Sequence, residues 1–242
     1  MLLARDLFQV AVYSINDYQL LRHLSVPGLK PCNDNDMTSC VRYKCLYMSD
    51  YNNSCIHRYD LRSSAIMQWR VPGSPVGLSI TPSCNLLVTC RDTILTHYTY
   101  TGRLVELSAD SGQCVREITL RPDIVRLSHS AQLTTGQYVV CHGDWNNIHH
   151  RVCLIGDDGK VTRSYSGQHD YEVRKCHLAV DKDSQFIFVA DECNHRVELL
   201  SPTLEFVRYV IEKLTHLCRL YLDQATQRLF VGRFGNVVVI QL

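Results

Sequence analysis

Short alternating runs of apolar and polar residues, separated by turn-forming residues, dominate the chain. They are clearest between residues 177 and 210, where four runs follow one another: HLAV, FIFVAD, RVELL and FVRYV. Alternation with a period of two gives a strand two different faces, and tight turns connect antiparallel neighbours. The pattern therefore predicts a four-stranded antiparallel meander. A lone meander cannot bury both its faces, so similar units are expected elsewhere in the chain.

Similar runs do recur along the sequence. Aligned on their last residue, they end at Asp50, Cys90, Cys141, Asp191 and Arg233, with spacings of 40, 51, 50 and 42 residues. A period of roughly 40–50 residues with four strands per unit is typical of a β-propeller blade. The sequence thus predicts an all-β propeller of four-stranded antiparallel blades, forming one domain over residues 1–242. Six blades are expected, at about 8–26, 38–71, 75–120, 127–165, 174–210 and 217–242, and five remain possible.

The two ends and the third blade depart from this regular pattern. Two strands are expected in residues 8–26 and three after residue 217, so the termini either share one blade or leave two incomplete ones. Residues 94–120 contain one hairpin more than a blade needs, with turn glycines at Gly102 and Gly112. It is either an extra surface hairpin or a separate short blade. Trp69, on an outer strand, is expected to pack between blades.

The overall composition excludes several classes of function. A formal net charge of +1 gives no global attraction to nucleic acid, and no apolar run reaches the length of a membrane span. Arg5 and Asp6 interrupt the apolar start, which does not resemble a secretory signal, so a cytoplasmic location is expected. The twelve cysteines contain no CxxC pair. Those within apolar strands, such as Cys90, Cys141 and Cys153, are expected to be buried free thiols.

One polar loop carries a recognisable pattern. It comprises Asp191, Asn194, His195 and Arg196, with an echo at Asp50 and Asn53. Asp and Asn side chains accept backbone N–H bonds in such loops, and the arginine can bridge to a neighbouring blade, so a structural role is expected.

This pattern resembles the NHL repeat of β-propellers. VAD is followed, after a short gap, by Asn194-His195-Arg196-Val197, and partial copies occur at Asp50-Tyr51-Asn52-Asn53 and His150-Arg151-Val152. The resemblance implies a propeller that acts as a recognition module. In TRIM-type relatives such a propeller follows RING, B-box and coiled-coil segments of a ubiquitin ligase, and no pattern for these segments occurs in this sequence.

The position just after each aligned strand is the expected binding face. It collects aromatic, Arg and His side chains, which suit recognition on a rigid scaffold. The candidate binding residues are Tyr51, Arg91, His142, Trp145, Glu192, Arg233 and Phe234. The favoured function is non-enzymatic binding of a protein partner, without a cofactor. The resemblance to TRIM-type NHL propellers adds single-stranded RNA as an alternative ligand, in which case the chain would be the substrate-recognition part of a ubiquitin ligase system.

Chemistry at a metal is a further alternative, as in six-bladed propeller lyases or hydrolases. His129 and His177 begin the first strands of adjacent blades near the central channel, which places them well to share an ion. His142, His149 and His150 instead cluster in one loop. A structural role is the expectation for all five histidines. No GxSxG nucleophile elbow and no glycine-rich phosphate loop occurs in the sequence.

Overall fold

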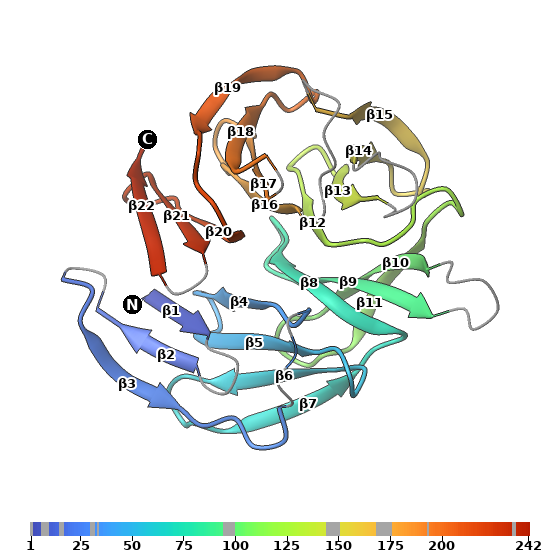
Figure 1. Ribbon diagram of the computed structural model, residues 1–242. Helices are drawn as coiled ribbons and strands as arrows, with labels where there is room; N and C mark the ends of the chain where they lie inside the picture. Colours follow the sequence, from blue (N-terminus) through green and yellow to red (C-terminus); the bar gives the residue numbers. More distant parts are fainter. Residues whose placement is uncertain are drawn as a thin grey trace.

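The computed structural model describes residues 2–5, 10–14, 17–29, 32, 34–93, 100–143, 151–167, 176–192, 194–233 and 236–242. These residues form strands connected by turns and loops in six antiparallel sheets, five of which are arranged around a central axis (Figure 1). Within the described part of the chain there is no helix long and apolar enough to cross a membrane. The all-β propeller expected from the sequence is confirmed.

Four sheets are complete blades of four strands, and in each of them strands that are consecutive in sequence are neighbours in the sheet. The alternation of apolar residues forms them, because each blade buries both faces against its neighbours. Their strands are β4 (Met37–Cys40), β5 (Cys45–Asp50), β6 (Cys55–Asp60) and β7 (Ile66–Arg70); β8 (Ser74–Ile80), β9 (Leu86–Thr93), β10 (Tyr100–Leu107) and β11 (Cys114–Thr119); β12 (His129–Gln132), β13 (Tyr138–His142), β14 (Arg151–Ile155) and β15 (Val161–Tyr165); β16 (Cys176–Val180), β17 (Ile187–Asp191), β18 (Arg196–Leu200) and β19 (Phe206–Ile211).

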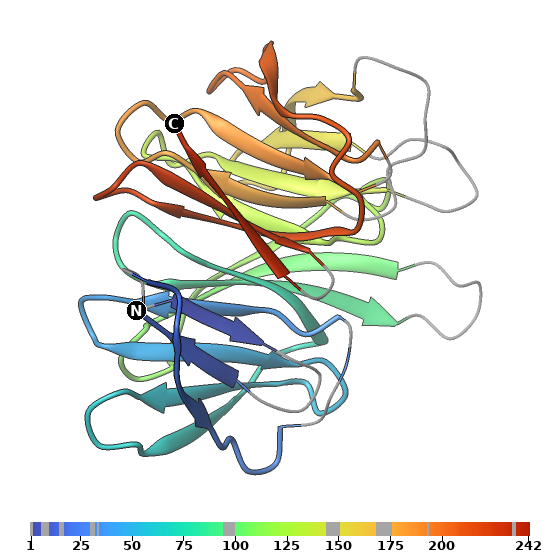
Figure 2. The same cartoon turned by 60° about the vertical axis from the view of Figure 1, so that its left-hand side comes forward.

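The two terminal sheets have three strands each and are separate, so the first and last blades are incomplete, as expected. No pairing joins them among the residues that the structure describes. Figures 1 and 2 show them on the same side of the molecule, and Tyr18 of the first sheet contacts Phe230 of the last, with ring centroids 6.5 Å apart. Their strands are β1 (Leu2–Arg5), β2 (Val10–Tyr13) and β3 (Leu20–Leu24), and β20 (Leu217–Asp223), β21 (Arg228–Arg233) and β22 (Asn236–Gln241).

Five sheets place their first strand at the axis. These strands are β4, β8, β12, β16 and β20, and Arg219 on β20 reaches Asp36, just before β4, which brings the last of them next to the first. The N-terminal sheet packs outside this ring: its Val10 and Val12 lie against Leu46 and Met48 of β5. The ring therefore has about five blades, the lower of the two expected counts, with the N-terminal sheet filling the sector between the last and first of them.

Three expectations about the strands are corrected. The head of the chain has three strands, because Leu2–Arg5 pairs with Val10–Tyr13. The extra hairpin within residues 94–120 is absent from the described residues: β9 and β10 are single eight-residue strands, and residues 94–99 lie outside the described part. Gly102 is not a turn residue. It pairs with Arg91, and a Cβ on it would lie 2.7 Å from the Leu127 Cγ, so glycine is required for blade contact.

Buried side chains between neighbouring blades form the core. Trp69 on β7 is buried against Tyr47 and against the turn at Gly112, which belongs to the next blade and has a φ of +72°. Trp69 thus packs between blades as expected. The Tyr47 hydroxyl donates a hydrogen bond to the Ala109 carbonyl across the same interface.

A disulfide joins two other blades and overturns one expectation. Cys141 on β13 and Cys176 on β16 are bonded, with their Cα atoms 6.1 Å apart. The prediction of a free thiol was wrong for Cys141, because the ends of these two strands meet at the blade interface. Cys90 and Cys153 are free and buried, as expected.

Replacing Trp69 with alanine is expected to lower the free energy of unfolding by about 3–5 kcal/mol, because a large buried aromatic leaves a cavity between two blades. Urea titration followed by circular dichroism measures this change. Val115→Ala, at a side chain 56% exposed on β11, is the control and is expected to change stability little. Equal effects of the two substitutions would contradict this packing role.

Candidate functional site at the propeller axis

Each of the five inner strands contributes one residue at the same level of the axis. Their equivalence follows from register: each lies opposite the residue just before one of the aligned second-strand positions, which are Asp50, Cys90, His142, Asp191 and Arg233. The five axial residues are Asp36, Gly77, His129, His177 and Arg219. Three of them carry the metal-ligating or acid–base chemistry that a functional site requires, so the axis is the first candidate site.

Side chains at the axis hydrogen-bond to the backbone of the next blade. The Leu78 N–H donates to the Asp36 Oδ2 at 2.8 Å, the Leu178 N–H to the His129 Nδ1 at 3.4 Å, and the Leu220 N–H to the His177 Nδ1 at 3.2 Å. A side chain that accepts a buried N–H removes the cost of leaving that donor unpaired. Each of these axial side chains therefore links its blade to the next one by a hydrogen bond.

Gly77 and Arg219 complete the ring in different ways. A Cβ on Gly77 would lie 2.9 Å from the His129 Cα, so the absence of a side chain lets the blades approach closely. Arg219 donates from Nε to the Asp36 Oδ1 at 2.9 Å and from Nη2 to the Asn35 carbonyl at 3.0 Å. The last inner strand is thereby bonded to the first.

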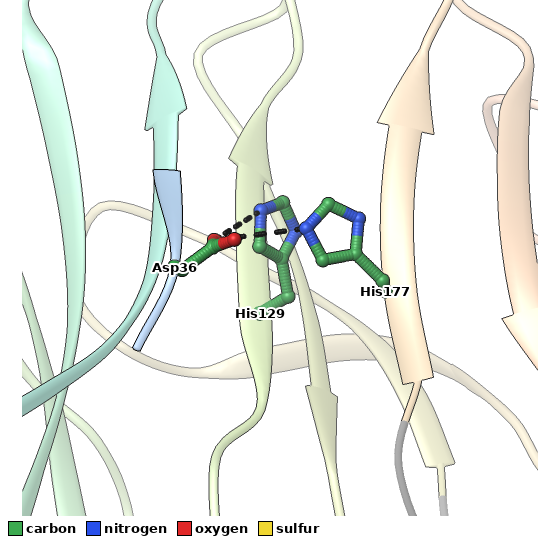
Figure 3. Close-up of side chains that lie close together, drawn as sticks. All are labelled: Asp36, His129 and His177. Carbon is green, nitrogen blue, oxygen red and sulfur yellow. Dashed lines mark ion pairs between the residues drawn. The ribbon is translucent and has the colours of Figure 1, made fainter. Parts of the chain in front are cut away.

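The two imidazoles and the carboxylate converge on one point. The rings of His129 and His177 are stacked with centroids 3.8 Å apart, and each Nε2 lies 3.6 Å from the Asp36 Oδ2, as Figure 3 shows. The side chains of all three are at least nine-tenths buried. A charged group at this depth must be compensated by its neighbours.

The charges of the cluster balance. Burial raises the pKa of Asp36, but the Arg219 guanidinium and the two imidazoles outweigh burial and hold the pKa well below its ordinary value. Burial lowers the pKa of His129 to about 3 and also lowers the pKa of His177. Near neutral pH the site thus holds one carboxylate, one guanidinium and two neutral imidazoles.

The tautomers of the histidines argue against a metal at the axis. Ligating atoms of Asp36, His129 and His177 do lie within 4.8 Å of one another. In both rings, however, Nδ1 accepts a backbone N–H, so a neutral ring must carry its proton on Nε2. The His129 Nε2 accordingly lies 3.1 Å from the Leu78 carbonyl, which accepts that proton. A protonated nitrogen cannot bind a metal, so the cluster fits a structural role in which hydrogen bonds join the blades at the axis. We call it the axial plug.

The predicted binding face is only partly available for contacts. Tyr51, Glu192 and Arg233 are half-buried at blade ends, and the Arg233 Nη2 donates to the Thr215 hydroxyl at 3.3 Å. Arg91 is mostly buried, donates to the Leu127 carbonyl of the next blade and lies 4.0 Å from the Asp34 carboxylate. Trp145 and Phe234 lie outside the described residues.

His142 is buried, which corrects the predicted surface position, because the sequence alignment of this blade was off by one residue. His142 pairs with Arg151, as Asp191 pairs with Arg196, so it occupies the strand-end position that the sequence had suggested for Cys141. Its Nε2 lies 3.2 Å from the Cys153 Sγ, and burial lowers its pKa to about 4. It is a core residue of its blade and is not on the surface.

The polar loops have matching geometry in two blades. The Asp191 Oδ1 accepts the Asn194 N–H at 3.2 Å and Oδ2 accepts the Asn194 amide at 2.6 Å. Asp50 and Asn53 repeat both bonds at 3.1 and 2.8 Å. His195 has a left-handed backbone, with a φ of 55°, at the turn that follows Asn194.

Arg196 is held inside its own blade by the contacts that the structure describes. Its guanidinium lies 3.3 Å from the Asp191 carboxylate, 2.8 Å from that of Glu198, and over the ring of Tyr209. The expected bridge from this arginine to a neighbouring blade is therefore not among the described contacts.

Similar proteins are recognisable from structure and not from sequence. No protein-family model and no curated protein matches the chain. Among solved structures, a Bacteroides caccae protein of unknown function has a TM-score of 0.70 at 15% identity, covering 96% of this chain and 86% of that one. Staphylococcus aureus virginiamycin B lyase has a TM-score of 0.63 at 11% identity, covering 98% of this chain and 78% of the lyase. The Dos1 propeller has a TM-score of 0.59 at 10% identity, covering 96% of this chain and 61% of that one. At these identities the likeness shows the propeller fold alone, and membership of the NHL family stays a prediction.

The axial plug predicts a specific dependence of stability on pH. The folded-state pKa of His129, about 3, lies below the ordinary value of 6.5, so between these values the unfolded chain binds a proton that the folded chain does not. Stability is thus expected to fall as the pH drops from 6.5 toward 3. In His129→Asn, which keeps an acceptor near the Leu178 N–H, the slope near pH 5 should be shallower by up to about 1.4 kcal/mol per pH unit.

Urea unfolding at several pH values between 5 and 7 measures this slope. His23→Asn is the control, because His23 is exposed on β3 and should leave the slope unchanged. An unaltered slope in His129→Asn would show that His129 titrates in the folded protein.

Proposed function

We propose that the chain is a non-enzymatic recognition module that binds a protein partner by accepting an extended partner strand at β22. The supporting observation is that β22 is the third strand of its sheet and has no fourth strand beside it among the described residues. An exposed sheet edge offers unpaired N–H and C=O groups to an incoming strand.

The register of β22 identifies the groups on its open side. The Leu242 N–H donates to the Gln227 carbonyl, so Leu242, Ile240 and Val238 direct their backbone toward β21. Because antiparallel bonding alternates, Val237 and Val239 direct theirs away from it. Val237 is also 39% exposed. An added strand would therefore gain main-chain bonds to these two valines.

The chemistry of β22 differs from that of the other sheet edges. The outer strands of the four complete blades carry charged residues, namely Arg70 on β7, Arg116 and Glu117 on β11, Arg163 on β15 and Arg208 on β19. Charged side chains on an edge discourage strand addition. β22, with the sequence NVVVIQ, has none. It has the apolar character of an inner strand but the position of an edge.

The complete blades indicate what the partner strand should look like. In each of them a third strand is covered by a five- or six-residue outer strand, such as FVRYVI or IMQWR. These strands combine apolar side chains with one or more charged or polar ones. A partner segment of the same pattern would complete the last sheet and cover the exposed Val237.

The loop face remains a candidate for additional contacts. Arg233 and Phe234 immediately precede β22, so this end of the strand lies beside the predicted face. Tyr51 and Glu192 contribute half-buried side chains on other blades, whereas His142 is buried. Contacts from these loops would set specificity, and the β22 edge would supply most of the affinity.

Single-stranded RNA and lyase or hydrolase chemistry receive less support. RNA binding of this kind relies on free arginines and stacking aromatics, but Arg91 bonds to the Leu127 carbonyl and the net charge is only +1. Lyase chemistry would need a reactive group at the axis. There Asp36, His129 and His177 bond with one another and with the backbone.

A peptide with the sequence of residues 204–212 is expected to bind the intact protein, because it carries the pattern of a natural outer strand. Fluorescence anisotropy of the labelled peptide measures binding. Val237→Lys, which places a charge on the open edge, should weaken binding at least about tenfold. Val115→Lys, on the outer strand β11, should leave it unchanged.

Amide hydrogen exchange supplies an independent readout of the same proposal. The peptide should slow exchange at Val237 and Val239. Binding that is equally strong to Val237→Lys, or protection confined to other strands, would refute strand addition at β22.

A further inference from the structure

A second cluster of metal-ligating side chains lies at the corner between β5 and β6, away from the axis. Asp50 ends β5, Cys55 begins β6, and His57 follows two residues later on the same face of that strand. The His57 Nε2 lies 3.3 Å from the Asp50 Oδ2 and 3.7 Å from the Cys55 Sγ. The three residues are between 0% and 2% exposed, so their ligating atoms face one another inside the blade.

These separations match the geometry of a zinc ion. Zinc binds Cys sulfur, His nitrogen and carboxylate oxygen in a tetrahedron with bonds of about 2.0–2.3 Å, which places its ligand atoms about 3.3–3.7 Å from one another. Both separations given above fall in this range, and the ligating atoms of all three residues lie within 4.8 Å of one another. Three side chains thus present an S, N, O donor set to one point.

The equivalent corner of another blade carries different side chains at the same three positions. There Asp191, Arg196 and Glu198 occupy the positions of Asp50, Cys55 and His57, since Asp191 pairs with Arg196 as Asp50 pairs with Cys55. The guanidinium of Arg196 lies 3.3 and 2.8 Å from the two buried carboxylates and offsets part of their charge. In the β5–β6 corner a thiol and an imidazole replace the arginine and the glutamate. A divalent cation bound there would take over the role of the guanidinium.

The surroundings favour ligation over acid–base chemistry. Asp50 and Cys55 approach the same nitrogen of His57, whereas a catalytic relay uses both ring nitrogens. Without an ion the His57 Nε2 donates to the Asp50 carboxylate, and no described group bonds the His57 Nδ1, so the ring proton can move to Nδ1 and leave Nε2 free to bind a metal. Asn53 donates two hydrogen bonds to Asp50 and fixes its carboxylate, as outer-shell residues do at metal sites.

We propose that Asp50, Cys55 and His57 bind one zinc ion that fastens the β5–β6 corner. The Gln68 side-chain amide donates to the Cys55 Sγ at 2.9 Å and would orient that ligand. The burial of the three ligands makes this a structural ion, loaded as the blade folds, and distinct from any binding event at β22.

Cobalt substitution of the whole protein tests the proposal. Protein refolded with Co²⁺ should bind one ion per chain and show a thiolate-to-cobalt charge-transfer band, and excess Zn²⁺ should remove that band. Cys55→Ser should abolish it. His57→Ala should weaken affinity by at least about 100-fold, because even outer-shell partners contribute about 10–100-fold.

Cys45→Ser is the matched control. Cys45 is a buried free thiol at the other end of the same strand pair, so this variant should keep the band. The wild-type protein alone can overturn the proposal: no charge-transfer band, together with no zinc retained after gel filtration of protein made in zinc-supplemented medium, would exclude the site. A band that survives in Cys55→Ser would place the ion elsewhere.

Discussion

The ion pair between Asp36 and Arg219 is the contact on which the ring most depends. It joins residues 183 positions apart in sequence and brings the last inner strand to the first. Many propellers close by pairing strands from the two termini, which uses a row of backbone hydrogen bonds. Here no such pairing joins the terminal sheets in the described residues. The buried Asp36 and the partly exposed Arg219, with their neutral histidine neighbours, perform that task. The axis is consequently a structural element whose polar groups are committed to one another.

Much of the fold could be predicted because a propeller repeats one simple pattern. Alternation of apolar residues indicated the four complete blades, and the period set their order. The strand Leu2–Arg5 was missed because it has only four residues followed by charges, too few for alternation to be visible. Gly102 was assigned to a turn because a glycine inside a strand looks the same in sequence as one in a turn. Only the approach of Leu127 distinguishes the two.

The candidate site was harder to predict, since it depends on register to a single residue. His129 and His177 were recognised as axial, but Asp36 sits in a loop and Arg219 in the middle of a strand, and neither stands out as polar in an apolar setting. The slip that put Cys141 where His142 belongs made a core histidine look like a surface one. The pairing of His142 with Arg151 resolves it. A signal was present, however: once the second strands are aligned correctly, the inner-strand residue that pairs with the position before each aligned residue is the axial one.

The disulfide between Cys141 and Cys176 divides the ring mechanically. It covalently ties two adjacent blades, whereas among the described residues no strand pairing or disulfide crosses the seam between β20 and β4. On heating, the two disulfide-linked blades are expected to stay together, and the ring is expected to separate first at the seam between β20 and β4. Opening at the seam would uncouple β20–β22 from the N-terminal sheet first. The blade interfaces of the ring are therefore not equivalent: one is covalently fixed, and another is the expected place of opening.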